Sequence, residues 1–345
     1  MKRLGPRLLA VLLLLSLHSF AQDGDGLLKF ASLGDFKLVS GESIRDCRIG
    51  YRAFGHLNAA KSNVILFTTW ATGTTEMLRG QVGAGKIADS SKYFIVMIDA
   101  LANGVSSSPS NSRLQPRMQF PKITMRDMVN TQYEVLTKEL GIHHVKAVVG
   151  ISMGGMQTFQ WIVSHPDFMD KAVPIVGSPR LAPYDLVLWK SEIDAIKKDP
   201  EWKNGDYTEN PAGLQLAEFG ALVGKTPQRF NQETTREKVL ATLEKEAKQP
   251  GPDANDHIRQ MEAMMSLDVS DVFDHFMQKA AAAVKAKVLV VVGNNDHVVT
   301  PGPATAFARL IGADVLAFDS DCGHQTPACE DKAVTARATA FLEQP

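Results

Sequence analysis

Apolar residues recur along this chain in short continuous runs, and the runs alternate with helical patterns. A strand of a parallel sheet is covered on both faces, so it appears as a continuous apolar run. Two earlier segments, 36–39 and 47–54, instead alternate apolar and polar residues and predict an antiparallel hairpin. Together they predict an α/β fold with a mostly parallel, eight-stranded, doubly wound sheet. The six continuous runs are 64–69, 93–99, 145–149, 171–176, 287–292 and 314–318.

Helical periodicity connects the predicted strands. Residues 124–140 begin with a pattern that resembles a capping box, with Thr124 as the N-cap and Asp127 three positions later. Further helical patterns lie at 156–165, 303–311 and 332–342. Strand and helix therefore alternate as the winding of a parallel sheet requires.

Residues 179–285 depart from this alternation and show helical patterns alone, separated by prolines. A helical insertion between two strands of a sheet is typical of a lid over a site. We therefore predict a core formed by 22–178 and 286–345 with a lid between them. The helical patterns of the lid are 184–197, 232–248 and 257–266.

The last of these helices carries Met261, Met264 and Met265. Methionine fills irregular apolar spaces, so these side chains could line an acyl or alcohol pocket. Burial inside the lid is the interpretation we favour, because methionine is among the residues most often found in cores.

The first 21 residues have a composition of their own. Lys2, Arg3 and Arg7 precede an apolar run at 8–17, and Ser19-Phe20-Ala21 fits a small-x-small cleavage site. Residues 1–21 therefore predict a secretory signal peptide, with an uncleaved anchor as the alternative. We expect an exported protein, periplasmic or secreted, without stable membrane association after cleavage.

Composition narrows the functional classes. Hydrophobic residues make up 44% of the 345, which is enough for a large core. The net charge of −1, with no basic block, predicts no nucleic-acid partner. The cysteines and histidines lack metal-ligand spacing, so we expect no metal and no cofactor.

The strongest chemical motif lies at 145–155, where an apolar strand ends at Gly150 and a helical run follows at once. Ser152 occupies the centre of a G-x-S-x-G pattern, which indicates a nucleophile elbow. Gly150 and Gly154 leave room for the sharp turn, and the helix directs its free N–H groups at the serine. The alternative is a glycine-rich turn that contains a serine by chance.

A serine hydroxyl needs a base, and the base needs a carboxylate to orient it. Asp296 and His324 each follow a predicted strand, as Ser152 does, so all three converge at one edge of the sheet. Their order along the chain, Ser then Asp then His, is the order this architecture uses. Asp319 and Asp321 are alternatives for the acid, and a plain loop histidine is the alternative for His324.

Two backbone N–H groups are candidates for an oxyanion hole. Met153 follows the serine, and Ala71 lies in the loop after the strand 64–69, where this architecture places its first donor. The alternative for the second loop is an ordinary turn. Near His324, Cys322 and Cys329 are seven residues apart, a spacing that permits a disulfide in an exported chain.

With these residues placed, the chain resembles the α/β-hydrolase superfamily, in particular its homoserine O-acetyltransferase-like branch. The resemblance runs from about Tyr51 to the C-terminus. It implies that Ser152, Asp296 and His324 occupy the nucleophile, acid and base positions. It rests on YRAFGHLN at 51–58, ATG at 71–73, FPKITMRDMV at 120–129 and SMGGMQ at 152–157.

The chain departs from the transferases directly after His324. They carry an aspartate there that contacts the amino group of homoserine, whereas this chain has Gln325. Acetyl-CoA is also cytoplasmic, while this chain carries an export pattern. We therefore expect an exported carboxylic-ester hydrolase that acts on a small-molecule ester through an acyl-enzyme. A homoserine O-acetyltransferase using acetyl-CoA is the alternative, and a catalytically silent binding protein is less favoured.

Overall fold

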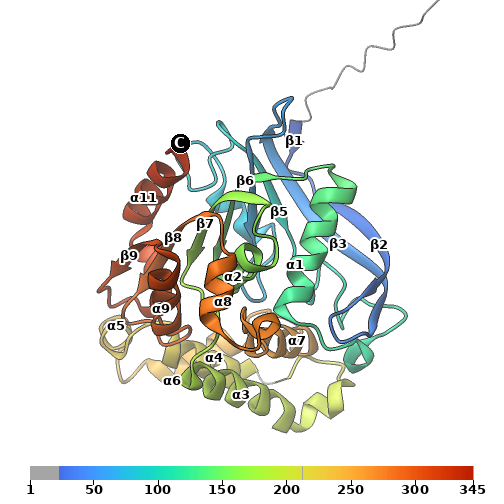
Figure 1. Cartoon of the computed structure of the whole chain (residues 1–345). Helices are drawn as coiled ribbons and strands as arrows, with labels where there is room; N and C mark the ends of the chain where they lie inside the picture. Colours follow the sequence, from blue (N-terminus) through green and yellow to red (C-terminus); the bar gives the residue numbers. More distant parts are fainter. Residues whose placement is uncertain (1–22, 212, 345) are drawn as a thin grey trace, which may run out of the picture.

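The computed structural model describes residues 23–211 and 213–344. The predicted signal peptide at 1–21 lies outside the described residues. Within them, nine strands form a single sheet (Figure 1). The strands are β1 (Asp23–Asp25), β2 (Lys29–Lys37), β3 (Ser43–His56), β4 (Val64–Thr68), β5 (Phe94–Ile98), β6 (Val145–Ile151), β7 (Met169–Ile175), β8 (Lys287–Gly293) and β9 (Asp314–Phe318).

The sheet has the order β1-β3-β5-β4-β6-β7-β8-β9, with β2 also paired to β3. The strands β1, β2 and β5 pair with β3 antiparallel, and every pair from β5 to β9 is parallel. This confirms the predicted fold class and the antiparallel hairpin. The sheet has one strand more than the eight expected, because β1 has only three residues and shows no apolar alternation.

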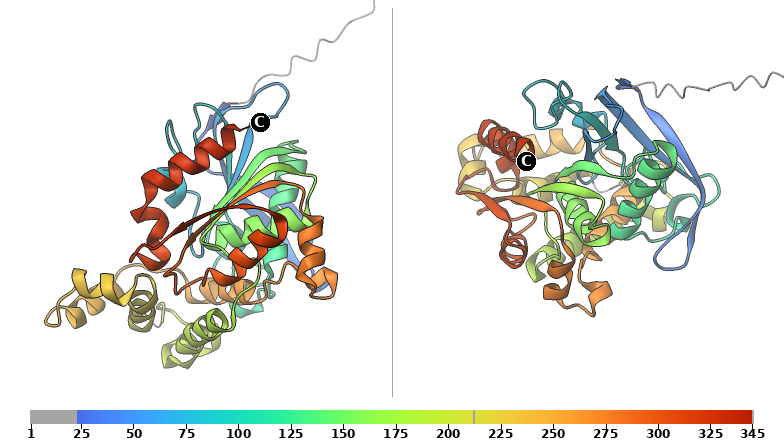
Figure 2. Two further views of the ribbon diagram at one scale, coloured as in Figure 1. Left: turned by 60° about the vertical axis from the view of Figure 1, so that its left-hand side comes forward. Right: turned by 45° about the horizontal axis from the view of Figure 1, so that its top comes forward.

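Helices cover both faces of the sheet (Figures 1 and 2). One core contains Leu66 of β4 together with side chains of α1, α2, α8 and α9. The other contains Ile65 and Phe67 of the same strand with residues of α11 and of the short helix η1. Alternate residues of each strand thus enter opposite cores. These helices are α1 (Met125–Glu134), α2 (Met153–Ser164), α8 (Met277–Ala283), α9 (Gly302–Ile311), α11 (Asp331–Glu343) and η1 (Met77–Gln81).

Helix α1 begins as expected. The Thr124 hydroxyl accepts from the Asp127 N–H, and the Asp127 carboxylate accepts from the Thr124 N–H at 2.8 Å. The helix continues as one π-helical turn, η3 (Val135–Glu139), and leads to β6. This segment therefore delivers the chain to the start of the strand that ends at Ser152.

The chain between β7 and β8 is helical, and its helices other than α8 gather at the lower end of the molecule in Figure 1. Within it, α3 contacts α4 and α7, whereas α8 packs on α2 and α9 of the core. The helices of this segment are α3 (Pro183–Lys198), η4 (Pro200–Gly205), α4 (Gly213–Val223), α5 (Pro227–Glu233), α6 (Val239–Ala247) and α7 (Ala254–Met265).

Two expectations for this segment change. The prediction of a single helix at 232–248 is wrong. The backbone becomes extended at Thr234, and this break separates α5 from α6. Of the three methionines, Met261 and Met264 are fully buried in the main core, and Met265 packs partly against it. They contribute packing rather than a pocket wall.

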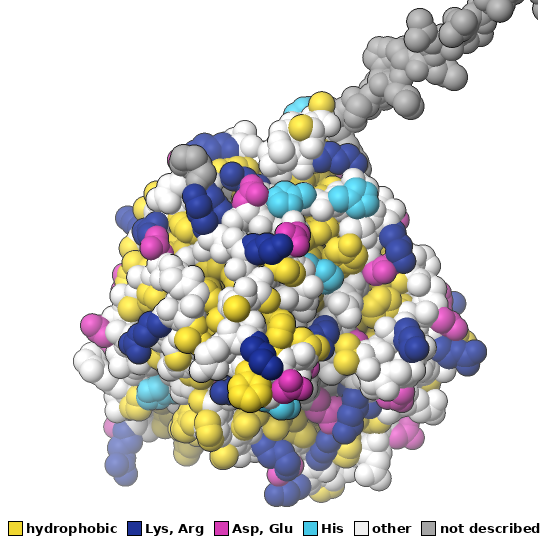
Figure 3. Space-filling view, in the orientation of Figure 1, with side chains coloured by type: hydrophobic (Ala, Val, Ile, Leu, Met, Phe, Trp, Pro, Cys, Tyr) yellow, Lys and Arg dark blue, Asp and Glu magenta, His cyan; other side chains and the backbone are white. Residues whose placement is uncertain are grey.

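The surface carries mixed charge. Lys and Arg side chains are interspersed with Asp and Glu on the face drawn in Figure 3. Across the described residues, no helix combines the length and the apolar character that a membrane span needs.

Candidate active site

The turn after β6 has the geometry of a nucleophile elbow. Ser152 has φ 58° and ψ −120°, a conformation that a non-glycine residue adopts only at a cost of about 1–3 kcal/mol. Its N–H donates to the Ile175 carbonyl at 2.8 Å, and its carbonyl accepts from the Met156 N–H at 3.0 Å. The end of β7 and the first turn of α2 thus hold the strained residue in place.

Close backbone contacts around the turn explain its glycines. A Cβ on Gly150 would lie 2.1 Å from the Gly154 carbonyl oxygen, and one on Gly154 would lie 2.6 Å from the Thr68 carbonyl oxygen. The Thr68 hydroxyl donates to the Gly154 carbonyl at 2.9 Å and fastens β4 to the start of α2. Side chains are excluded because three backbone segments meet here.

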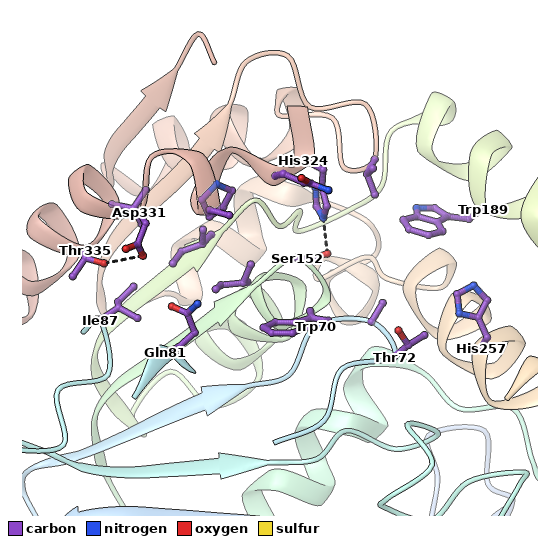
Figure 4. A pocket seen from close by; sticks show the side chains of 18 residues that line it. Trp70, Thr72, Gln81, Ile87, Ser152, Trp189, His257, His324, Asp331 and Thr335 are labelled. Carbon is purple, nitrogen blue, oxygen red and sulfur yellow. Dashed lines mark hydrogen bonds between the residues drawn. The ribbon is translucent and has the colours of Figure 1, made fainter. Parts of the chain in front are cut away.

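The structure brings Ser152, His324 and Asp296 together. His324 Nε2 lies 2.8 Å from Ser152 Oγ, and His324 Nδ1 lies 2.7 Å from Asp296 Oδ2 (Figure 4 shows the contact of His324 with Ser152). The carboxylate accepts the Nδ1–H, which leaves the Nε2 lone pair to accept the serine hydroxyl. This is the arrangement that lets an imidazole act as the general base of a serine nucleophile.

The acid position is distinct from its two alternatives. Asp296 is 2% exposed, and its second oxygen accepts from the Val298 and Val299 N–H groups at 2.8 and 3.0 Å. Asp319 accepts instead from the Asn294 amide, and Asp321 pairs with an arginine of α5. Only Asp296 of these three carboxylates contacts His324.

A covalent cross-link brackets the histidine. His324 lies in the short helix η6 (Gly323–Gln325), which leads into α10 (Thr326–Cys329). Cys322 and Cys329 form a disulfide across these two turns, so the pairing that their spacing permitted is present. The Thr326 hydroxyl also donates to the Gly323 carbonyl at 2.6 Å. The loop that carries the histidine is therefore cross-linked at both ends.

The two expected oxyanion donors lie beside the serine. Met153 is the first residue of α2, so its N–H has no carbonyl partner within the helix. Ala71 lines the same cavity as Ser152. The next N–H along, that of Thr72, donates to Gln260 Oε1 at 2.6 Å and is therefore occupied. The N–H groups of Ala71 and Met153 stay the predicted donor pair.

Buried glutamines support the loop that carries Ala71, a role that no sequence pattern indicated. Gln260 of α7 accepts from Thr72 and donates to the Leu101 carbonyl at 3.0 Å. Gln157 of α2 donates to the Thr69 carbonyl at 2.9 Å and accepts from Gln132 of α1. Both glutamines lie among other polar residues of their helices, so the sequence pattern carried no signal for either residue. Each ties the oxyanion loop to a different helix.

A buried aspartate fixes the lid to the acid loop. Asp185 of α3 accepts from the Thr300 N–H and hydroxyl at 3.2 and 3.1 Å, four residues beyond Asp296. Burial raises the pKa of the Asp185 carboxyl, while the hydrogen bonds from Thr300 lower it. The first helix of the lid, α3, is therefore hydrogen-bonded to the loop that carries Asp296.

A cavity of about 580 Å³ opens at Ser152 (Figure 4). Trp189 and His257 of the lid line one side, and Asp331 and Thr335 of α11 line the other. The size suits a small organic molecule. Across the described residues, no three His, Cys, Asp or Glu side chains are grouped so that they could hold a metal ion.

Comparison with known proteins identifies the family of this fold. The model of the family described as alpha/beta hydrolase fold matches residues 72–326. A probable esterase of Corynebacterium glutamicum is 35% identical over 62% of this chain, and the match covers 63% of that relative's length. An ethyl acetate hydrolase of Pseudomonas veronii is 31% identical over 85% of this chain and 87% of its own.

The solved structure of an acetylester hydrolase from Corynebacterium glutamicum superposes with a TM-score of 0.86 and 29% identity, over 92% of this chain and 97% of that one. Homoserine O-acetyltransferases are also relatives, including one from Chlorobaculum tepidum, 30% identical over 91% of this chain and 94% of its own. The chain belongs to the α/β-hydrolase family, in its homoserine O-acetyltransferase-like branch. It is an enzyme of the esterase or O-acyltransferase kind.

Proposed function

We propose that this chain is an exported carboxylic-ester hydrolase that works through Ser152, His324 and Asp296. The observation that carries the proposal is the continuous pair of hydrogen bonds, 2.8 and 2.7 Å, that links these side chains at the mouth of the cavity. A nucleophile, its base and an orienting carboxylate in this geometry are suited to acyl transfer.

In the first half of the reaction, Ser152 Oγ attacks the ester carbonyl and His324 Nε2 takes the hydroxyl proton. Asp296 stabilises the imidazolium that forms. The carbonyl oxygen becomes an oxyanion that accepts from the N–H groups of Ala71 and Met153, each worth on the order of 3 kcal/mol to the transition state. The alcohol then leaves with the proton from His324, and an acyl-enzyme remains.

In the second half, water takes the place of the alcohol. His324 removes its proton, the water oxygen attacks the acyl carbonyl, and the same N–H groups hold the second oxyanion. Collapse of this intermediate returns the proton to Ser152 and releases the acid. The acceptor decides between hydrolysis and transfer, because the first half of the reaction is common to both.

The cavity wall favours water as the acceptor. Gln325, directly after His324, lines the cavity with a neutral amide and supplies no charge for an amino-alcohol acceptor. Relatives named as an esterase and an ethyl acetate hydrolase match at 35% and 31% identity. Acyl transfer from acetyl-CoA to homoserine is the second candidate, because a relative with that name covers 91% of this chain.

The test is turnover by protein that begins at residue 22, on p-nitrophenyl acetate, butyrate and octanoate. Parallel reactions contain acetyl-CoA and homoserine, with free CoA as the readout. We expect ester hydrolysis without homoserine-dependent CoA release. The opposite result would establish the transferase instead.

Ser152→Ala is the first variant to compare. We expect it to fold as the wild type does and to lose activity by on the order of 10⁴- to 10⁶-fold, because the nucleophile is gone. Full turnover in this variant would refute the assignment. Stoichiometric labelling of wild-type Ser152 by a fluorophosphonate would exclude a catalytically silent protein.

Export is proposed from residues 1–21 alone, with their basic start and apolar run. The N-terminus of protein recovered from an expressing cell tests it. A mature chain that begins at Gln22 outside the cytoplasm supports export. A chain that retains residues 1–21 in the cytoplasm contradicts it.

A further inference from the structure

The cavity extends from Ser152 in two directions. One part reaches the lid at Trp189 and His257, and the other reaches the first turns of α11 (Figure 4). We call the second part the α11 arm. The residues that line it include Gln81 at the end of η1, Ile87, Pro327 of α10, and Asp331, Val334 and Thr335 of α11.

An ester needs space on two sides of the nucleophile. Its acyl group and its alcohol group leave the carbonyl carbon in different directions, and that carbon must lie against Ser152 Oγ for the attack. One narrow space could therefore hold only one of the two groups. The α11 arm supplies a second space, on the side of Ser152 away from the lid.

The walls of the α11 arm are largely apolar. Ile87 and Val334 belong to the core on this face of the sheet, and half-buried Pro327 lines the arm from α10. A water molecule in such a space finds few hydrogen-bond partners, whereas a methylene group gains by leaving bulk water. Each methylene that enters should raise kcat/KM by about three- to fourfold until the arm is filled.

Asp331 gives the arm a negative charge. Among the described residues that line the cavity it is the only carboxylate, and none is a lysine or an arginine. The Thr335 hydroxyl lies 3.5 Å from its Oδ1, and the carboxylate forms no ion pair with any described residue. A substrate chain that ends in a carboxylate would therefore meet a like charge in a space with little water to screen it.

We propose that the α11 arm binds an uncharged, apolar chain of the ester, and that Asp331 excludes chains that end in a carboxylate. This inference rests on the proposed hydrolase function and adds a substrate class to it: neutral esters with a chain longer than acetyl or ethyl on one side of the carbonyl. The cavity volume of about 580 Å³ supports this class, because an ester as small as ethyl acetate would leave much of it empty.

Chain length is tested in two series of esters. The p-nitrophenyl esters of acetate, butyrate, hexanoate and octanoate vary the acyl group, and the acetates of ethanol, butanol, hexanol and octanol vary the alcohol. The readout is the ratio of kcat/KM for a long ester to that for the shortest in its series. A ratio removes effects that a variant has on the chemistry common to both esters.

Thr335→Phe is the diagnostic variant, because it places a ring in the arm. The matched control is Thr339→Phe, since Thr339 is one turn further along α11, is also half-buried and does not line the cavity. We expect the long-to-short ratio to fall by at least about 10-fold in Thr335→Phe, in one of the two series, and to stay unchanged in Thr339→Phe. The series that responds identifies the group, acyl or alcohol, that occupies the arm.

Charge is tested with pairs of esters that exchange a terminal methyl for a carboxylate. Ethyl hexanoate is compared with monoethyl adipate, and pentyl acetate with 5-acetoxypentanoate. Asp331→Asn should raise the ratio of kcat/KM for the anionic ester to that for the neutral one by about 3- to 10-fold in the pair whose chain enters the arm. Glu330→Gln is the control, because Glu330 precedes Asp331 and does not line the cavity, and it should leave both ratios unchanged.

Equal long-to-short ratios in wild type and Thr335→Phe in both series would overturn the arm. Anionic-to-neutral ratios that Asp331→Asn does not raise would overturn the charge exclusion. If wild type hydrolyses the acetates of p-nitrophenol and ethanol but no longer ester, the arm is wrong while the hydrolase proposal stands. If wild type hydrolyses no ester, the hydrolase proposal fails, and binding of hexyl acetate in ligand-observed NMR judges the arm, where equal binding to wild type and Thr335→Phe refutes it.

Discussion

The strand ends and the lid build this site in different ways. Ser152, Asp296 and His324 each lie within a few residues of a strand end, so the sheet itself delivers them to one edge. The lid residues Asp185 and Gln260 reach the site through side-chain contacts with segments far away in the chain. The sheet thus fixes the reacting groups, and the lid shapes what surrounds them.

This difference makes the two regions respond differently to substitution. A change at a strand end removes a reacting group from an otherwise intact frame. A change in the lid shifts a supporting loop or weakens the docking of the lid, with smaller and more specific effects. The predictions below separate the two kinds of response.

The largest effect is expected for Asp296→Asn, at about 10⁴-fold in kcat. The amide would present an N–H or a weaker acceptor to His324 Nδ1, so the ring would lose its working tautomer and the support for its positive charge. Steady-state kinetics with p-nitrophenyl acetate measure the loss.

Asp319→Asn and Asp321→Asn are the matched controls, because neither carboxylate contacts His324. Both should keep kcat within about threefold of wild type, as surface changes usually do. A loss at either control that exceeds the loss at Asp296 would mean that the acid is misassigned.

A lid substitution, Gln260→Leu, should lower kcat by about 10- to 100-fold. It frees the Thr72 N–H and the Leu101 carbonyl, so the oxyanion loop at Ala71 loses its support from α7. KM should change little, since the interaction is made in the transition state.

The control for this prediction is Gln249→Leu, the same exchange at an exposed position after α6. It should leave both constants near wild type. A Gln260→Leu enzyme that changes KM alone would show that the glutamine shapes substrate binding instead of the oxyanion loop.

The last prediction concerns stability rather than turnover, through pH and the docking of α7. The pKa of the Asp256 carboxyl is raised to about 7. Burial is the main cause and the charge of nearby Asp253 adds to it, while hydrogen bonds from Ser110 lower the pKa. A carboxyl with a raised pKa binds its proton more tightly in the folded state. Its contribution is therefore complete below pH 4 and is lost as the pH rises to about 7, by about 1.4 kcal/mol per pH unit.

Urea unfolding of wild type and Asp256→Asn at pH 5, 6, 7 and 8 measures this contribution. The free energy of unfolding of wild type, taken relative to the variant, should fall with each step until about pH 7 and then level off. A difference that is constant across this range would mean that the carboxyl ionises normally in the folded chain.

The sequence predicted the sheet because its signals are local. The continuous apolar runs correspond to the parallel strands β4 to β9, and the G-x-S-x-G turn around Ser152 has the tight backbone contacts for which its glycines leave room. The positions of Asp296 and His324 after β8 and β9 followed from the same pattern. The convergence of these residues depends only on strand direction, which alternation with helices dictates.

The lid was less predictable because its contacts are distant in sequence. No pattern indicated α4, and the two residues Thr234 and Thr235 gave little warning of the break between α5 and α6. The pairing of Thr72 with Gln260 spans 188 residues, which periodicity cannot reveal.

The Cys322–Cys329 disulfide makes the position of His324, the predicted base, depend on an oxidation step. A chain that has just been synthesised carries two thiols there, and His324 lies on an unlinked loop between them. Oxidation closes the loop once, after which the imidazole needs no further ordering at each turnover. The reduced chain is therefore expected to hold its base less firmly than the chain with the disulfide.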